Sequence, residues 1–301
     1  MTYFATYFGR SNATVLFVIG LTLSACGGGG GAGGQPANPS APAGPDTPVV
    51  TPPPPPSPPP ASADGLSAAD KKEIAMQLVS SAENSSLNWK AQYGYIEDIG
   101  DGRGYTAGII GFTSGTGDML ELVTAYNAIQ PVNVLGKYLP ALRKVNGSAS
   151  HDGLDPNFVA DWGIAAQDAV FKQSQDTLRD NEYFNPAVAL AKQDGLRTLG
   201  QFIYYDAIVM HGPGSDTQRS SFNGIRAVAL QKALPPSKGG DETAYLNAFL
   251  DVRRALMLSE SDHAGNIDRI DTEQRLFLQN ANLDLKTPLN WKVNQTSFHI
   301  P

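Results

Sequence analysis

Apolar residues recur at helical spacing along much of the chain after residue 64. Ile74, Leu78, Val79 and Ala82 mark one face of a first helix, which we expect to start at the capping-box-like sequence 67–70. The same spacing predicts four more helices. Their apolar faces are Met119, Leu122, Val123 and Tyr126; Val134, Leu135, Tyr138, Leu139 and Leu142; Phe158, Trp162, Ala165 and Ala169; and Tyr245, Phe249, Val252 and Leu256.

Residues at the ends of these stretches indicate where the helices start. Asp118 opens the second helix, and Asp155–Pro156 suits an N-cap followed by proline at the first helical position. The last of the four spans residues 241–260. Residues 196–210 form the most apolar helix of all, although Asp206 lies inside it. The tail from Asn280 reads as irregular structure that packs through Leu283, Leu285 and Trp291.

One stretch departs from the helical pattern. Residues 105–113, YTAGIIGFT, carry β-branched and aromatic residues broken by glycines, which predicts a short twisted hairpin. No repeat period is present. The sequence therefore predicts a mainly α (α+β) domain with one small sheet near its start.

The first 63 residues differ in composition from the rest. Arg10 precedes the apolar run ATVLFVIGLTL, which is too short to span a membrane and predicts a signal peptide over residues 1–25. Residues 23–26, LSAC, resemble a bacterial lipobox, in which Cys26 is lipidated and becomes the mature N-terminus. The alternative is an ordinary cleavage site beside an accidental cysteine. The lipobox predicts export to the cell envelope with a lipid anchor in a membrane.

Residues 26–63 carry the expected lipidated cysteine, then glycines and a proline-rich tract. Residues 36–60 contain 13 of the 22 prolines, so this segment is unable to bury a core and should be an extended spacer. At about 3.1 Å per residue it reaches on the order of 75 Å. The third predicted region, residues 64–301, is the globular domain, and we expect it to be monomeric.

Charge narrows the choice of partner. Arg10 and Asp46 are the charged residues before residue 64, so the predicted domain keeps the net charge of −7. An acidic domain argues against nucleic acid and is compatible with a cationic partner. The single cysteine, Cys26, precedes the domain, so its stability must come from its core.

Two carboxylates are the candidates for chemistry. Glu83 lies at the end of the first predicted helix, and Asp101 lies among glycines in the sequence IGDGRG. Glycosidic cleavage needs two acids, one to protonate the leaving oxygen and one to activate water or attack directly. By spacing alone, both residues could equally be solvated surface acids.

The residues around this pair resemble a known family. The stretch 95–123, YIEDIGDGRGYTAGIIGFTSGTGDMLELV, is similar to the signature of bacterial chitosanases in glycoside hydrolase family 46. The resemblance extends from about Leu66 to the end and includes NLDLKTPLNWKV near the C-terminus. It implies a lysozyme-like fold, in which two helical lobes are joined by a long helix and enclose a cleft with the small sheet.

The resemblance also implies roles for the catalytic residues. Glu83 would be the general acid and Asp101 the general base of an inverting, endo-acting hydrolysis of β-1,4 bonds between glucosamine units. Thr106 would help to orient the attacking water. Inversion requires the two carboxyls to stand roughly 6.5–9.5 Å apart. If the ribbon is regular, alternation puts Asp101 and Thr106 on opposite faces, but the glycines allow a bulge.

Five further residues match positions in the family's cleft. Arg103 would hold Asp101 or substrate, and Asp118 would bind a glucosamine amine. Ser85, Tyr95 and His263 would contact the sugar. Four of them have a structural alternative: Arg103 could be a surface arginine in a turn, Asp118 an acid at a helix N-terminus, Ser85 a cap and Tyr95 a core residue. The spacing around His263 differs by about one residue from that of the family.

The resemblance assigns a supporting network as well. A carboxylate as deeply placed as Asp206 needs a cationic partner if it is buried. The family implies that Arg254 and Arg269 join it in supporting Glu83. The sequence departs from the family near the C-terminus, where Thr296 replaces an acidic residue that contacts substrate.

Other motifs do not fit their usual contexts. The glycines of IGDGRG precede no strand–turn–helix unit, and Ser114 lies in GFTSGTG rather than GxSxG. Residues 262–273 end like an EF-hand loop, but Ala264 and Ile267 interrupt it. The four histidines show no metal spacing. We therefore expect no cofactor and no metal, with chitosan or glucosamine oligomers as partners.

Two alternative functions stay open at this point. A lysozyme-like fold with a lipid anchor would also suit a murein hydrolase, although the signature stretch disfavours it. A lipid-anchored glycan-binding protein without turnover is the second alternative, and the presence of both Glu83 and Asp101 argues against it. The sequence does not define the preferred oligomer length, the tolerance of N-acetylated units or the membrane that carries the anchor.

Overall fold

The computed structural model describes residues 64–260 and 263–301. Within these ranges no helix combines the length and apolarity that crossing a bilayer would need. The predicted signal peptide, Cys26 and the proline-rich spacer lie outside the described residues.

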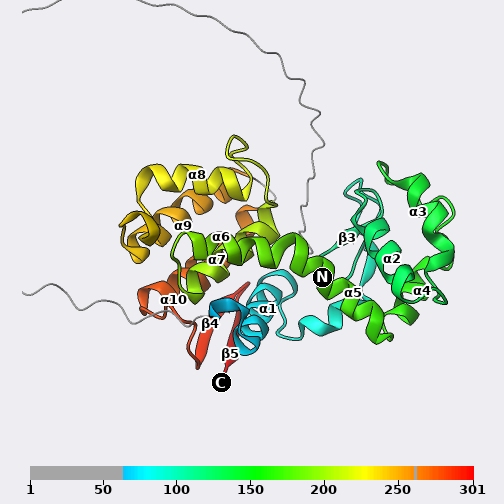
Figure 1. Cartoon of the computed structure of the whole chain (residues 1–301), viewed down its shortest axis with the longest axis horizontal. Helices are drawn as coiled ribbons and strands as arrows, with labels where there is room; N and C mark the ends of the chain where they lie inside the picture. The colour runs from blue at the N-terminus through cyan, green and yellow to red at the C-terminus, as the bar shows by residue number, and fades with distance from the viewer. Residues whose placement is uncertain (1–63, 261–262) are drawn as a thin grey trace, which may run out of the picture. The chain divides into compact units, whose positions relative to one another are not determined.

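The described chain is mainly helical, as predicted, and adds two small antiparallel sheets (Figure 1). Short 3-10 and π turns (η) join or extend several helices. The helices are α1 (Ala69–Asn84), α2 (Asp118–Ile129), α3 (Leu139–Val145), α4 (Phe158–Ala165), α5 (Ala169–Arg179), α6 (Asn185–Gln193), α7 (Thr198–His211), α8 (Phe222–Lys232), α9 (Glu242–Ser259) and α10 (Arg275–Gln279). The turns are η1 (Gly65–Ser67), η2 (Trp89–Gly94), η3 (Gly136–Tyr138), η4 (Asp180–Phe184), η5 (Pro236–Lys238), η6 (Ala264–Asn266) and η7 (Arg269–Gln274).

The first sheet lies where the hairpin was predicted. Its strands β1 (Ile96–Asp98), β2 (Tyr105–Ala107) and β3 (Phe112–Thr113) pair in sequence order. Thr106 of β2 lies between Glu97 of β1 and Thr113 of β3. All three residues of β2 are buried, because the strand is central and packs against the helices that follow. This position makes β2 a rigid support for the side chains at its ends.

Two hydrophobic clusters organise the described residues. One gathers side chains from α1, α6, α7, α8 and α9 and from the C-terminal hairpin. The other gathers side chains from β2, β3 and α2 to α5, with Trp162 fully buried at its centre. Helices α5, η4 and α6 follow one another without a break from Ala169 to Gln193 and contribute to both clusters. Figure 1 shows this continuous helix joining the two groups of elements.

Two predicted helix starts are wrong. Ser67 belongs to the preceding η1 turn, and the N-cap of α1 is Ala68, without a side-chain hydrogen bond. Helix α4 begins at Phe158 rather than after Asp155. The carboxylate of Asp155 instead accepts a 2.5 Å hydrogen bond from the Tyr105 hydroxyl, so a tertiary contact replaces the predicted cap.

Other predicted boundaries also shift. The face that ran from Phe158 to Ala169 belongs to two helices, since Asp168 caps a new helix by accepting a 2.8 Å bond from the Val170 amide. Residues 280–288 are irregular, as predicted, and Leu283, Leu285 and Trp291 pack into the first hydrophobic cluster. The rest of the tail is not irregular. It forms a hairpin of β4 (Leu289–Val293) and β5 (Thr296–Ile300), whose turn residues Asn294 and Gln295 both have positive φ. A turn of that kind matches the twist of a two-residue hairpin.

Candidate active site

Glu83 lies in the last turn of α1, with its side chain only 19% exposed. Its Oε1 accepts a hydrogen bond from Nη2 of Arg269, a fully buried residue of η7. Glu83 and Arg269 are far apart in sequence, so the tertiary fold brings the expected pair together. The arginine fixes the direction in which the carboxyl group points.

Arg269 is itself held by the expected buried acid. Its Nη1 lies 3.7 Å from Oδ1 of Asp206, and both side chains are 1% exposed. Oδ2 of Asp206 accepts 2.7 Å hydrogen bonds from Nη1 of Arg253 and from the amide of Gln274. Burial alone would raise the pKa of Asp206, but the cations of Arg269 and Arg253 outweigh it and lower the pKa. Asp206 is therefore an ionised link between two arginines.

The prediction of Arg254 in this network is wrong. Arg254 is half-buried and pairs with Asp271 at 2.8 Å, whereas its neighbour Arg253 is fully buried and binds Asp206. The buried face of helix α9 explains why Arg253 and not Arg254 binds Asp206. Its buried face is Tyr245, Leu246, Phe249, Leu250, Arg253 and Met257, so Tyr245 and Phe249 were predicted correctly and Val252 and Leu256 were not. Spacing from Phe249 admits both Val252 and Arg253 on that face, so the sequence pattern did not decide between them.

Asp101 lies in the turn between β1 and β2, so strand alternation does not decide where it points. Arg103 holds it through three contacts. The backbone amide donates to Oδ1 at 3.0 Å, Nε donates to Oδ2 at 2.7 Å, and Nη2 also contacts Oδ2. Arg103 is thus the partner of Asp101 rather than an unattached surface arginine. The pair keeps the carboxylate on a short loop at the edge of the sheet.

Thr106 is almost completely buried on β2, and its hydroxyl oxygen has no hydrogen-bond partner among the described residues. Thr106 and Glu83 line the same cavity, which encloses about 670 Å³ including its open side. The Thr106 hydroxyl therefore lacks the hydrogen bond that buried polar groups ordinarily make, and it belongs to a residue that lines the cavity.

The cavity lies between elements of both hydrophobic clusters. Tyr95 and the backbone around Ile110 line one side, and Met76, Trp89 and Arg179 line another. Tyr95 also donates a 3.2 Å hydrogen bond to Glu97. Burial, followed by the charge of Glu97, raises the pKa of Tyr95 to about 12, so the hydroxyl stays protonated and can donate or accept.

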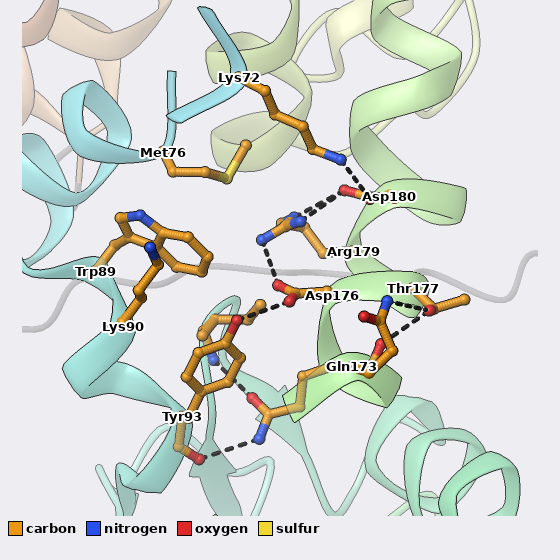
Figure 2. Close-up of polar contacts among 12 residues, drawn as sticks. Lys72, Met76, Trp89, Lys90, Tyr93, Gln173, Asp176, Thr177, Arg179 and Asp180 are labelled. Carbon is orange, nitrogen blue, oxygen red and sulfur yellow. Dashed lines mark hydrogen bonds and ion pairs between the residues drawn. The ribbon is translucent and has the colours of Figure 1, made fainter. Parts of the chain in front are cut away.

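A charged network closes the cavity at the joining helix. Figure 2 shows Arg179 between Asp176 and Asp180, at 2.8 Å from each. Lys72 of α1 reaches Asp180 at 2.5 Å, and the Tyr93 hydroxyl of η2 donates to Asp176 at 2.7 Å. Three elements are thereby tied together behind the site. Sequence reasoning missed this network, because Lys72 and Tyr93 join the helical residues from other elements.

Asp118 begins α2, as predicted, and its Oδ1 organises the loop before it. Oδ1 accepts 2.9 Å bonds from the amides of Thr113 and Met119 and from the hydroxyl of Thr116. Burial raises the pKa of Asp118, and these hydrogen bonds oppose the shift. Oδ1 therefore has a structural role at the start of α2, whereas Oδ2 makes none of these bonds.

Ser85 has left-handed backbone geometry, with φ of 49°, and ends the helix that carries Glu83. Its amide donates back to the carbonyl of Ser80, so Ser85 is the C-cap of α1. The residue is exposed. Thr296, where the family's acid is replaced, begins β5 and is also exposed.

His263 lies next to two other polar residues that the sequence did not connect. Its Nδ1 is 2.5 Å from Oε2 of Glu260, and its ring lies 5.5 Å from that of His211. Donor atoms of the three residues lie within 4.8 Å of one another, a distance compatible with a metal ion. However, Nε of Arg253 donates to Nε2 of His211 at 3.1 Å, which places the ring proton on Nδ1. That nitrogen is a hydrogen-bond donor and not a ligand.

Comparison with known proteins agrees with this site. The family model described as "Glycosyl hydrolase family 46" matches residues 77–289. The chain is 67% identical over 229 residues to a chitosanase of Streptomyces sp. (strain N174), covering 76% of this chain and 81% of that protein. It is 60% identical over 239 residues to a chitosanase of Nocardioides sp. (strain N106), covering 79% and 84%.

A solved structure of similar sequence supports the fold. The structure of chitosanase OU01 with substrate matches with a TM-score of 0.74 and 57% identity, covering 79% of this chain and 99% of that one. This agreement confirms the lysozyme-like fold expected from the sequence. The chain belongs to glycosyl hydrolase family 46 and is a glycoside hydrolase.

Proposed function

We propose that this enzyme cleaves β-1,4 bonds inside chitosan chains by an inverting mechanism. One observation carries the proposal: Glu83, oriented by a buried arginine, and Thr106, with its unpaired buried hydroxyl, line one cavity. The strand that holds Thr106 follows directly after the turn of Asp101. The chitosanase relatives support chitosan as the substrate.

In this mechanism the two acids act from opposite sides of the sugar. Glu83 donates a proton to the glycosidic oxygen as the bond to the anomeric carbon breaks. Arg269 binds Oε1, so Oε2 is the oxygen assigned to carry that proton. Asp101 accepts a proton from the attacking water, and Arg103 keeps its carboxylate in position. Thr106 contributes a hydrogen bond that orients this water.

Charge supplies the selectivity for glucosamine. Each unit of chitosan carries an amine that is a cation when protonated, and the domain has a net charge of −7. Oδ2 of Asp118 is proposed to bind one of these amines, while Tyr95, Ser85 and His263 contact sugar hydroxyls. Acetylation removes the cation and adds bulk, so chitosan should be cut much faster than chitin.

The test is the anomeric form of the first product. A glucosamine hexamer is digested and followed by proton NMR before mutarotation. Inversion at a β-linkage releases the α-anomer first. Release of the β-anomer would contradict the role of Asp101 as general base, and faster digestion of peptidoglycan than of chitosan would contradict the substrate.

We also propose that the enzyme is lipid-anchored through Cys26, in the bacterial cell envelope. The motif at residues 23–26 supports this proposal, and the spacer after it would hold the catalytic domain away from the membrane. Cys26→Ser should release the protein from the membrane fraction with its specific activity unchanged. A wild-type protein found entirely in the soluble fraction would overturn the proposal.

A further inference from the structure

His211 is the last residue of α7 and contacts the arginine that supports the catalytic network. Its Nε2 lies 3.1 Å from Nε of Arg253, which comes from α9. The other ring nitrogen, Nδ1, is buried without a hydrogen-bond partner among the described residues. This imidazole lies beside His263 but is not among the residues that line the cavity, and it has no role in the proposed chemistry.

The contact determines the protonation state of His211. A guanidinium nitrogen is always a donor, so Nε2 must offer its lone pair and the ring must be neutral with its proton on Nδ1. Burial, then the charge of Arg253, lowers the pKa of His211 well below its ordinary value, with smaller contributions from His263 and Arg269. Among the described residues Glu260 lies close to the ring, and it is already paired with His263.

Helix α7 contacts Arg253 through Asp206, through His211 and through Sδ of Met210, which lies 3.4 Å from Nη2. Asp206 accepts from Nη1 at 2.7 Å, and its backbone carbonyl accepts from Nη2 at 3.5 Å. His211 accepts from Nε at the other edge of the guanidinium. Because the guanidinium is planar and rigid, fixing Nε also fixes the direction of Nη1. The hydrogen bond to His211 thus constrains the orientation of the Arg253 guanidinium relative to the Asp206 carboxylate.

The orientation of Arg253 affects Glu83 through the carboxylate that the arginines share. Arg253 occupies Oδ2 of Asp206, and Oδ1 faces Arg269 at 3.7 Å without a hydrogen bond. If Arg253 turned away, Arg269 would be the remaining arginine that neutralises the Asp206 carboxylate. Asp206 would then compete with Glu83 for the guanidinium of Arg269.

We propose that neutral His211 is a positioning residue for the general acid, acting through Arg253, Asp206 and Arg269. It touches neither substrate nor the reacting atoms. The inference rests on the proposed role of Glu83, and it adds that a hydrogen-bond acceptor at the end of α7 is required for full activity. Another side chain that accepts a hydrogen bond from Nε of Arg253 should be able to replace His211.

The test compares His211→Leu, which has no acceptor, with His211→Gln, whose amide oxygen can replace Nε2. His211→Leu should lower kcat about 3- to 30-fold with KM changed less than about twofold. The alkaline limb of kcat/KM, which reports loss of the acid's proton, should move to higher pH, because Arg269 holds Glu83 less tightly. His211→Gln should restore most of kcat and the position of that limb.

A matched control is His299→Leu, which removes an exposed histidine of β5 and should change none of these quantities. The proposal is overturned if folded His211→Leu keeps the wild-type kcat and pH profile, or if His211→Gln is impaired equally. Glu83→Gln is measured in parallel, because residual turnover in that variant would refute the acid assignment and not the role of His211.

If His211→Leu fails to fold, a measurement on the wild-type protein tests the proposal instead. Nitrogen-15 NMR of the wild-type imidazole should show the neutral form with the proton on Nδ1 between about pH 5 and 8. A proton on Nε2, or a charged ring near neutral pH, would overturn the proposal without any mutation.

Discussion

Asp206 and Arg253 form an ion pair at 2.7 Å in which both side chains are at most 1% exposed. Removing one partner of such a pair leaves a buried charge without compensation. Asp206→Asn should therefore lower the free energy of unfolding by about 3–5 kcal/mol, measured by urea denaturation. Activity at low temperature should fall as well, because Arg269 loses its second carboxylate.

The control for this prediction is a pair on the surface. Asp251 and Arg275 are 2.7 Å apart, but Asp251 is 63% exposed. Asp251→Asn should change the free energy of unfolding by about 0–1 kcal/mol. Equal effects of the two substitutions would show that burial does not set the strength of the Asp206 network.

Glu83→Gln and Asp101→Asn test the two carboxylates proposed to act in catalysis. Glutamine has no proton to donate to the leaving oxygen, and asparagine does not accept one from water, so turnover should fall at least about a thousandfold in each. Binding of a glucosamine oligomer, measured by calorimetry, should persist because both side chains keep their shape. Asp70→Asn, an exposed acid on α1, serves as the control and should retain full activity.

Glu273 predicts a pH dependence of stability. Burial, then the charge of Asp206, raises the pKa of Glu273 well above its ordinary value. Above about pH 4.3 the unfolded chain releases this proton while the folded protein keeps it. The free energy of unfolding should therefore fall as pH rises towards the folded pKa, by about 1.4 kcal/mol per pH unit.

Glu273→Gln should remove that slope, since the amide resembles the protonated acid and does not titrate. Melting curves from pH 5 to 8 for the variant and the wild type measure the difference. Glu121→Gln, which alters an exposed glutamate of α2, should leave the slope as it is. An unchanged slope in Glu273→Gln would mean that the buried carboxyl is ionised in the folded protein.

Asp118 separates a structural role from a binding role. Asp118→Asn keeps the Oδ1 acceptor that organises the loop but removes the negative charge. KM for chitosan should rise by an amount equivalent to about 1–3 kcal/mol, and its salt dependence should flatten. Because burial raises the pKa of Asp118, wild-type KM should also increase as pH falls through that value. A normal KM across a salt series would leave Asp118 as a helix cap alone.

Tyr93 tests the network behind the cavity. Tyr93→Phe removes the 2.7 Å hydrogen bond to Asp176, which keeps Arg179 as its other partner. The free energy of unfolding should fall by about 1.5–3 kcal/mol, the range for a hydrogen bond to a charged group. The control is Thr177→Ala, which alters the exposed residue after Asp176. Its free energy of unfolding should stay within about 0.5 kcal/mol of the wild-type value.

The spacing of apolar and polar residues was sufficient to predict an element whose formation depends on its own residues. Helix α9 follows from its apolar face and from Asp241, whose carboxylate caps it by accepting from the Ala244 amide at 2.8 Å. The hairpin around Thr106 follows from its β-branched residues and glycines. The C-terminal hairpin was missed, because its turn at Asn294 and Gln295 carries no glycine although both residues have positive φ.

The sequence by itself determined the helical class and the small sheet and, through resemblance, predicted Glu83 and Asp101 as the catalytic pair. Only the tertiary structure decided that Arg253 rather than Arg254 pairs with Asp206, and that His211 completes the pair. The physical reason is that a buried charge must find its partner across elements, here α7 and α9. Neighbouring arginines in a sequence are chemically equal, and only packing decides which of them is buried.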